Sequence, residues 1–386
     1  MQKFGETKEK MMPALRDDID PNGLLEYSVV YTDRALNHMS KVFQEVMRDL
    51  SVELKSLYNA DAVAIVPGSG TSGMESVARA LAKDKDCLII RNGWFSYRWT
   101  QILDATGVAK SSEVFCASHT NDEKAVFAPA DIEAVTTAIR NQKPAVVFAP
   151  HVETASGMML SDEYIRALGE AVHEVGGLLV IDCIASGCIW LDMKAVGIDV
   201  LISAPQKGLS STPCAGLVMM SEDAREAVLT STPSSFALDL KAWLNIMTAY
   251  ENGGHAYYAT MPTDGLKQLR DALLEAKAVG YDKLKSAQVE LGKGILAVLN
   301  GKGIQSVAHP GYQARGVVVC HAPNEAIHKG TAFAEQGLQI AAGTPLQVGE
   351  PEGYQSFRIG LFGLDKLTDV DGAITRFKAA ADKVFG

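Results

Sequence analysis

The chain has 386 residues, 47% of them hydrophobic and 21% charged, so it is long enough to form more than one compact unit. Its formal net charge of -10 and the lack of any Lys/Arg cluster exclude the basic face that a nucleic-acid partner requires. No apolar run approaches the length of a membrane span, and the charged opening MQKFGETKEK is unlike a signal peptide, so we expect no membrane partner.

Short apolar runs alternate with amphipathic segments through the first two-thirds of the chain. The apolar runs predict strands at 62–66, 87–91, 145–150, 178–182, 199–203 and 215–220. Apolar residues also recur at spacings of three and four over 71–82, 129–141 and 162–176, which predicts helices. This alternation is typical of an α/β domain whose largely parallel sheet is covered on both faces.

From about Pro262 the pattern changes. A long helical stretch over 265–301 is followed by short strands at 316–322 and 357–362 and by a terminal helix over 369–386. We expect a second, smaller α+β domain, with the long helix joining the two. The predicted division is an N-terminal arm (1–21), a large domain (22–262), and a linker helix with the small C-terminal domain (263–386).

The stretch VPGSGTSGMES carries the spacing G-x-G-x-x-G at Gly68, Gly70 and Gly73. A glycine-rich turn between a strand and a helix presents backbone N–H groups to an anion at the positive end of the helix dipole. A dinucleotide site also needs an acidic residue about 20 positions further on, but the next strand ends in Arg91 and Asn92. The turn therefore predicts a phosphate site without saying which phosphate.

Asp182 ends one apolar strand and Lys207 follows another, so both can project from the carboxyl edge of one parallel sheet. Taken singly, the lysine could be an ordinary surface residue and the aspartate a helix cap. Together with the glycine turn they form a set that one cofactor explains. Pyridoxal phosphate needs an anion cradle, a lysine amine, and a carboxylate that keeps its ring nitrogen protonated.

Six segments resemble, in order, the motif series of the class V, fold-type I aminotransferases: GSGTSGMES, NGWFSYRW, HVETASG, VIDCIASG, SAPQKGLSSTPCAG and FRIGLFG. The resemblance runs from about residue 60 to about residue 365 and is strongest to the alanine-glyoxylate (serine-pyruvate) group. It implies an α/β large domain with a mostly parallel seven-stranded sheet and a smaller C-terminal α+β domain. It also implies a pyridoxal phosphate-dependent transaminase that moves an amino group from a small amino acid to a small 2-oxo acid by a ping-pong mechanism.

The resemblance assigns roles to individual residues. Lys207 would hold the cofactor as a Schiff base and shuttle a proton, while Asp182 would pair with the pyridine nitrogen. The other contacts would come from Ser69, Gly70, Thr71 and Gln206 at the phosphate, Phe95 (or else Trp94) and Ile184 on the two ring faces, and Thr154 at the phenolic oxygen. The series implies no metal.

Two further roles depend on segments later in the chain. In HAYYATMP, Tyr257 and Thr260 match residues that reach the cofactor phosphate of the neighbouring subunit, which implies a homodimer with shared active sites. A plain loop before a helix is the alternative. Arg358 in FRIGLF would grip the substrate α-carboxylate with its two-pronged guanidinium, or else form a structural ion pair.

The N-terminal segment departs from the family, which usually carries a Pro-Gly-Pro stretch there. Tyr27, Tyr31, Arg34, Asn37 and His38 give it a polar and aromatic character that does not identify a substrate. Arg34 could recognise an acidic side chain or could be a solvated charge. The resemblance therefore leaves the amino donor and the acceptor open.

Two other activities stay open. A lyase of the same fold, such as a cysteine desulfurase, places a His before the lysine and a reactive Cys on a mobile loop. Here Gln206 precedes Lys207, and Cys320 lies in an apolar strand. An NAD(P) oxidoreductase built on the glycine turn would leave Lys207 without a role.

Cysteine usage bears on location. The six cysteines are scattered singly through apolar stretches without C-x-x-C spacing: Cys87, Cys116, Cys183, Cys188, Cys214 and Cys320. We expect free thiols in a reducing, cytoplasmic compartment.

Overall fold

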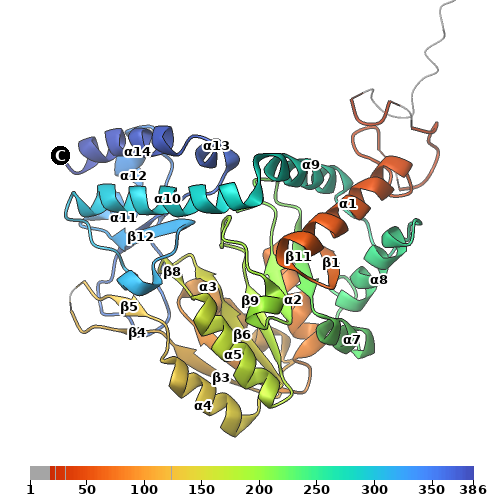
Figure 1. The fold of residues 1–386 in the computed structure, drawn as a ribbon, viewed down its shortest axis with the longest axis horizontal. Coiled ribbons are helices and arrows are strands. Elements are labelled where there is room, and N and C mark those ends of the chain that lie inside the picture. The colour runs from red at the N-terminus through yellow and green to blue at the C-terminus, as the bar shows by residue number, and fades with distance from the viewer. Residues whose placement is uncertain (1–17, 22, 31, 123) are drawn as a thin grey trace, which may run out of the picture.

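The computed structural model describes residues 18–386 except 22, 31 and 123. Its centre is a sheet of seven strands (Figure 1), which lie in the order β1 (Ala62–Pro67), β11 (Ala215–Met220), β10 (Val200–Ser203), β9 (Leu178–Asp182), β6 (Val146–Pro150), β2 (Asp86–Arg91) and β3 (Ser111–Cys116). Only β11 runs against its two neighbours; the pairs from β10 to β3 are parallel. The mostly parallel seven-stranded sheet is thereby confirmed.

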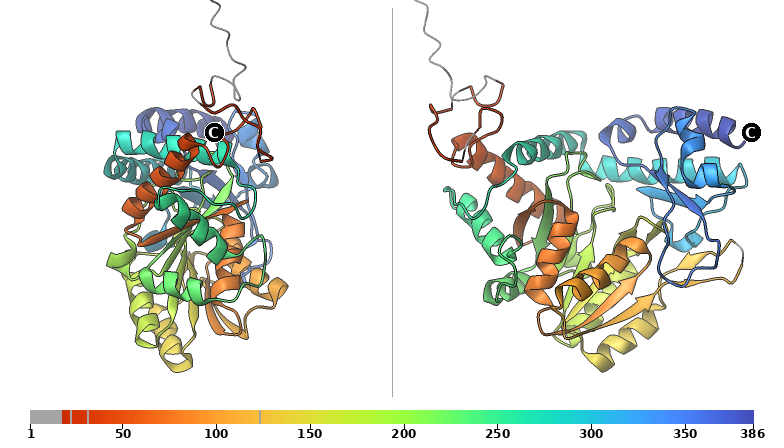
Figure 2. Two further views of the ribbon diagram at one scale, coloured as in Figure 1. Left: turned by 90° about the vertical axis from the view of Figure 1, so that its right-hand side faces the viewer. Right: turned by 180° about the vertical axis from the view of Figure 1, so that it is seen from behind.

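Helices cover both faces of this sheet. They are α1 (Lys41–Tyr58), α2 (Gly70–Leu81), α3 (Trp94–Thr106), α4 (Ile132–Gln142), α5 (Asp162–Glu174), α6 (Met193–Val196), α7 (Glu222–Thr230) and α8 (Leu240–Glu251). Helix α5 lies in front of the sheet in Figure 1, while α2 and α3 lie in front of it when the molecule is seen from behind in Figure 2. The strands they cover are buried on both sides, which is why β6 and β9–β11 read as continuous apolar runs.

Helix α2 sits unusually close to the sheet. A Cβ atom added at Gly216 on β11 would lie 2.7 Å from the Cα of Gly73 on α2. Two facing glycines therefore let the first turn of α2 approach the strand backbone, which fixes the glycine turn against the edge of the sheet.

The C-terminal part holds a three-stranded antiparallel sheet in the order β12 (Val317–His321), β14 (Ser356–Gly360), β13 (Ala341–Ala342). Around it lie α10 (Tyr281–Asn300), the 3-10 turn η1 (Pro310–Tyr312), α11 (Glu325–His328), α12 (Thr331–Ala334), α13 (Leu364–Leu367) and α14 (Val370–Val384). Two small hairpins, β4 (Ser118–His119) with β5 (Phe127–Ala128) and β7 (Val152–Glu153) with β8 (Met158–Met159), complete the strands. The smaller α+β unit is as the resemblance implied.

Two of the differences from the sequence prediction have a clear physical cause. The single helical stretch expected over 265–301 is two helices, α9 (Thr263–Val279) and α10, because Gly280 adopts φ +103 between them, a conformation that ends a helix. Strand β3 was not predicted, because it is an edge strand whose residues are mostly polar and exposed.

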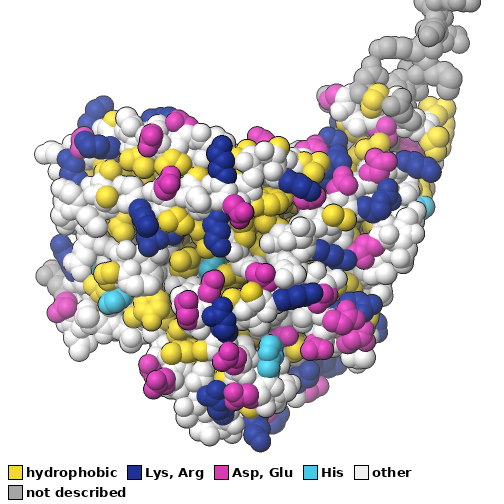
Figure 3. Space-filling view, in the orientation of Figure 1, with side chains coloured by type: hydrophobic (Ala, Val, Ile, Leu, Met, Phe, Trp, Pro, Cys, Tyr) yellow, Lys and Arg dark blue, Asp and Glu magenta, His cyan; other side chains and the backbone are white. Residues whose placement is uncertain are grey.

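The surface is mixed in charge. On the face in Figure 3, acidic and basic side chains are interspersed rather than gathered by sign. No helix in the described part of the chain combines the length and apolarity needed to cross a membrane.

Candidate active site

A cavity of about 440 Å³ opens at the carboxyl edge of the central sheet, where open α/β sheets bind ligands. It is lined by Ser69, Gly70, Thr71, Met74, Phe95, Arg98, Val152, Thr154, Asp182, Ile184, Ala185, Gln206, Lys207, Val317, Ala341, Arg358, Gly360 and Phe362. Every predicted site residue except Tyr257 and Thr260 is in this set. The large sheet and β14 of the small sheet both contribute to its wall.

The glycine turn forms one end of the cavity. Gly68 has φ +124, and Ser69 is the extended N-cap of α2. A side chain at Gly70 would collide with Ile184, so only glycine leaves the helix N-terminus open toward the cavity. The unbonded N–H groups of a first helical turn favour an anion at this point.

Arg98 joins this end of the cavity and was missed from the sequence. Its Nη1 donates to Thr71 Oγ1 at 3.0 Å, and its guanidinium lies 5.4 Å from the Phe95 ring centre. The signal that could have found it is its spacing, because a residue three positions after Phe95 on a helix faces the same side. A guanidinium beside a helix N-terminus strengthens an anion site.

Asp182 ends β9 and is 7% exposed. Its Oδ1 accepts a hydrogen bond from Ile184 N at 2.9 Å, and no basic group lies within ion-pair distance among the residues the structure describes. Burial raises the pKa of Asp182 to about 7; the charge of Glu153 adds to the rise and that of Arg98 opposes it. This is a desolvated carboxylate that a cationic ligand would stabilise.

Lys207 and Gln206 lie in the turn that follows β10. Burial lowers the pKa of Lys207, and the positive charge of Arg358 adds to the effect. A lowered pKa makes the neutral amine, the nucleophilic form, more accessible. Gln206 Oε1 is buried without a hydrogen-bond partner in the described part of the chain, so the cavity wall offers an unused polar group.

Phe95, Ile184 and Thr154 form the walls between these charged ends. Phe95 stands in the first turn of α3, and Ile184 follows Asp182 by two residues. Thr154 comes directly after β7. Trp94, the alternative to Phe95, packs 5.8 Å from the Tyr97 ring and does not line the cavity.

Arg358 reaches the cavity from β14. Its Nε donates to Ala342 O at 2.8 Å, and its guanidinium carbon lies 5.6 Å from the Phe95 ring centre. Burial lowers the pKa of Arg358, although the charge of Glu153 works against this. No carboxylate within the described ranges forms an ion pair with Arg358, so its charge is desolvated and free to take an anionic ligand.

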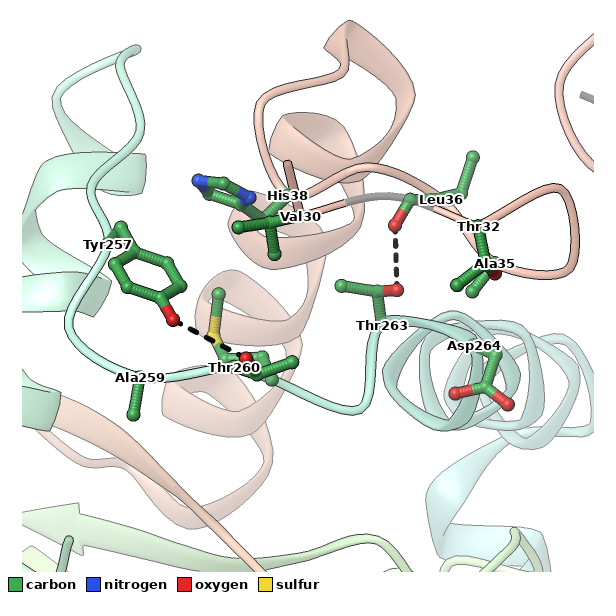
Figure 4. A pocket seen from close by; sticks show the side chains of 11 residues that line it. Val30, Thr32, Ala35, Leu36, His38, Tyr257, Ala259, Thr260, Thr263 and Asp264 are labelled. Atoms are coloured by element: carbon green, nitrogen blue, oxygen red, sulfur yellow. Dashed lines mark hydrogen bonds between the residues drawn. The ribbon is translucent and has the colours of Figure 1, made fainter. Parts of the chain in front are cut away.

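Tyr257 and Thr260 lie elsewhere, in a pocket of about 150 Å³ beside the N-terminal segment (Figure 4). The Tyr257 hydroxyl is 3.4 Å from Thr260 Oγ1, and the Tyr257 ring packs 5.5 Å from that of His38. Tyr257 is 54% exposed. One chain alone does not bring these two residues to the cavity.

The remaining N-terminal candidates have local contacts. Asn37 Nδ2 donates to Glu26 Oε2 and Ser28 Oγ, and Arg34 pairs with Asp33 at 3.4 Å on the surface. Tyr27 is 88% exposed. Tyr31 and most of the expected N-terminal arm lie outside the described residues.

The model of the class-V aminotransferase family matches residues 24–351. The chain belongs to the class-V aminotransferase family. Enzymes of this family use pyridoxal 5′-phosphate, and the chain is a pyridoxal phosphate-dependent transaminase. The cavity fits that cofactor, because it joins an anion cradle at Gly70, the buried carboxylate of Asp182, and an amine at Lys207.

This class-V aminotransferase has curated relatives along most of its length. It is 28% identical over 336 residues to 2-aminoethylphosphonate–pyruvate transaminase 2 of Paraburkholderia xenovorans, covering 86% of this chain and 84% of the relative. It is 27% identical over 279 residues to the L-aspartate–glyoxylate aminotransferase of Paracoccus denitrificans, covering 71% and 67%.

Its fold is shared with solved structures. The alanine–glyoxylate aminotransferase of Nostoc sp. superposes with a TM-score of 0.77 over 91% of this chain and 89% of that one, at 21% identity. An aspartate aminotransferase of Thermus thermophilus superposes with a TM-score of 0.74 over 90% and 93%, at 23% identity. The fold-type I assignment is thereby confirmed.

The family match, together with curated relatives that are named as transaminases, favours the transaminase over the lyase and the oxidoreductase. The thiol that a desulfurase mechanism would need is also unsuitable in this class-V aminotransferase. Cys320 lies fully buried on β12, and burial raises its pKa to about 12, which disfavours the nucleophilic thiolate.

We predict that the charge of Asp182 destabilises the cofactor-free protein at neutral pH. Burial raises its pKa to about 7, from about 4 when unfolded, so its favourable contribution is complete below about pH 4 and is lost as the pH rises through 7. Asp182→Asn is neutral throughout and keeps an oxygen for the N–H of Ile184. The free energy of unfolding of Asp182→Asn minus that of the parent should therefore be about 2 kcal/mol larger at pH 8 than at pH 5.

Urea unfolding of both apoproteins at the two pH values measures this difference. A gap between parent and Asp182→Asn that stays constant from pH 5 to pH 8 would contradict the assignment of a strongly raised pKa.

Proposed function

We propose that this enzyme transfers the amino group of a small amino compound to a small 2-oxo acid, pyruvate or glyoxylate. One observation carries the proposal: a single cavity holds an amine with a lowered pKa, a buried carboxylate, and a desolvated guanidinium, at Lys207, Asp182 and Arg358. The first two suit the cofactor, and the third suits a substrate carboxylate. Several curated relatives are named for pyruvate or glyoxylate.

Each cavity residue has a part in this proposal. When bound, pyridoxal phosphate supplies an electron sink that allows a proton to leave the carbon next to the amino group. Lys207 Nζ takes and returns that proton. The negative charge of Asp182 favours a protonated pyridine nitrogen, and the cationic ring in turn lowers the pKa of Asp182.

The other cavity residues bind and orient. The phosphate would lie at the N-terminus of α2, held by Ser69, Gly70, Thr71 and Gln206, with Arg98 as a further cation. Phe95 and Ile184 would cover the two ring faces, and Thr154 would reach the phenolic oxygen. These apolar faces also exclude water from the reacting carbon.

The amino donor has two candidates. An α-amino acid would place its carboxylate on the guanidinium of Arg358 in a two-pronged pair. A 2-aminoethylphosphonate donor is the second candidate, because relatives named for it align over 82–91% of this chain. Its phosphonate offers the same fork two oxygen acceptors.

A homodimer with shared active sites is part of the proposal. Several large apolar side chains are exposed in the N-terminal segment and in the region from 236 to 257: Leu24, Leu25, Tyr27, Val29, Phe236 and Tyr257. A second copy that covers them would bring Tyr257 and Thr260 to the phosphate end of the neighbouring cavity. The six free thiols support the proposed cytoplasmic location.

The proposed half-reaction is tested by adding amino donors to the protein loaded with pyridoxal phosphate. The panel is alanine, aspartate, serine and 2-aminoethylphosphonate. At least one of these donors should bleach the visible absorbance of the cofactor. Pyruvate or glyoxylate should then restore the band. Lys207→Ala should lose turnover by several orders of magnitude while still binding the cofactor.

Failure of every donor with a loaded parent protein would contradict the transaminase proposal for these substrates. Undiminished turnover in Lys207→Ala would remove that residue from its proposed role.

We predict that Arg358 anchors the carboxylate. Arg358→Lys keeps the positive charge but loses the planar fork, so the KM of the donor should rise about tenfold or more, with a further rise in Arg358→Ala. Cofactor absorbance and Tm should change little, because Arg358 holds no ion pair within the described ranges. Lowered Tm values with an unchanged KM would instead make Arg358 a structural residue.

We predict that Tyr257 and Thr260 act on the neighbouring subunit. Lys207→Ala subunits should be mixed with subunits that carry both Tyr257→Phe and Thr260→Ala. A hybrid dimer then contains one site with all elements intact, so activity should recover to a fraction of the parent value. Confirmed heterodimers without any recovery would show that the loop serves its own subunit.

A further inference from the structure

Glu153 is a fully buried carboxylate beside the cavity, and its two oxygens accept four hydrogen bonds. Its Oε2 accepts from Ser96 N at 2.8 Å and from Ser96 Oγ at 2.7 Å, while its Oε1 accepts from Phe95 N at 3.2 Å and Ala155 N at 3.0 Å. No basic side chain forms an ion pair with it in the part of the chain that the structure describes. A buried charge of this kind is tolerated only when its donors are firmly placed.

These donors show that Glu153 caps α3 from another segment of the chain. The N-cap of α3 is Gly93, which has no side chain to accept the N–H groups of the first turn. A Cβ atom at Gly93 would lie 2.7 Å from Glu153 Cγ, so the glycine makes room for the carboxylate. Glu153 therefore takes the place of the missing cap and also lies at the positive end of the helix dipole.

The capped turn carries cavity residues. Phe95 is in it, and Arg98 follows one turn later with its hydrogen bond to Thr71. On the other side, Glu153 directly precedes Thr154, and its bond to Ala155 N fixes the backbone around that residue. The carboxylate of Glu153 therefore links the first turn of α3 to the segment that carries Thr154.

We propose that Glu153 is a positioning residue, whose carboxylate fixes the first turn of α3 and so holds Phe95 in place for the cofactor ring. The inference rests on the proposed function only in the part that gives Phe95 its contact with the cofactor. Ser96 is central to this contact: its hydroxyl oxygen accepts from Asn92 N and Gly93 N, and its proton has Glu153 Oε2 at 2.7 Å and Gly93 O at 3.0 Å as acceptors.

The test variant is Glu153→Gln. It keeps the size and shape of the side chain, but one of the two carboxylate oxygens becomes an amide NH₂ group, which cannot accept a hydrogen bond from an N–H donor. The matched control is Asp131→Asn, since Asp131 caps α4 through Ala134 N at 3.0 Å and lies outside the cavity. In the cofactor-free protein, hydrogen exchange of the Phe95 and Ser96 amides should become at least about tenfold faster in Glu153→Gln only. The Kd for pyridoxal phosphate should rise about fivefold or more, and the circular dichroism of the bound cofactor should change.

A double-mutant cycle separates positioning from general loosening. Phe95→Ala removes the positioned ring, so adding Glu153→Gln to it should raise the Kd by less than Glu153→Gln does in the parent. Equal factors in both backgrounds would overturn the inference, as would faster exchange with an unchanged Kd and dichroism. If Glu153→Gln fails to fold, Ser96→Ala removes one donor and should show the same changes in smaller degree, and its lack of any effect would equally overturn the inference.

The two proposals fail in different ways. A parent protein that takes up no pyridoxal phosphate would overturn the proposed function. A parent that binds it with the same Kd as Glu153→Gln would overturn only the role of Glu153.

Discussion

The active-site cavity depends on a buried carboxylate that forms no ion pair with any residue the structure describes. Asp182 ends a strand that is covered on both faces, and within the described part of the chain its side chain accepts one hydrogen bond, from Ile184 N. Such a group destabilises the free protein at neutral pH and favours a ligand that brings a positive charge. A protonated pyridine nitrogen meets that need. Cofactor binding therefore relieves the unfavourable free energy of the buried charge, and the carboxylate in turn keeps the ring nitrogen protonated.

The fold supplies this arrangement because parallel strands end at one edge. Asp182 and the turn that carries Lys207 follow neighbouring strands, β9 and β10, and the facing glycines of α2 and β11 hold the anion cradle beside them. The small domain adds Arg358 from β14 across the cavity. Three basic side chains, Arg98, Lys207 and Arg358, and the buried carboxylate of Asp182 then share one cavity, which suits a ligand that carries negative charges.

Much of this was predictable from sequence. The six apolar runs mark strands whose two faces are both covered, including β1 at one edge of the sheet. The motif order identified the predicted cavity residues from Ser69 to Arg358. Strand β3 was not predicted, because this exposed edge strand lacks a continuous apolar run. Gly280 lies inside a helical pattern, and the pattern does not reveal that it adopts positive φ.

Other features depend on contacts that no local pattern encodes. Glu153 reaches Phe95 and Ser96 across more than fifty residues, so its role as a cap follows only from the structure. The spacing of Arg98 from Phe95 on a helix could have indicated that it faces the cavity. Its hydrogen bond to Thr71 joins α3 to α2, and no local pattern predicts that contact. The positions of Tyr257 and Thr260 outside the cavity of their own chain were implied by the resemblance, and their action on a second subunit stays a prediction.

The central claim concerns the protonation of Asp182, and infrared difference spectroscopy measures it directly. At pH 6 the cofactor-free protein should show the C=O stretch of a protonated carboxyl group that is absent from Asp182→Asn. Binding of pyridoxal phosphate should remove this band, because the cationic ring lowers the pKa of the carboxyl group. A band that persists unchanged in the loaded protein would contradict the pairing of Asp182 with the cofactor.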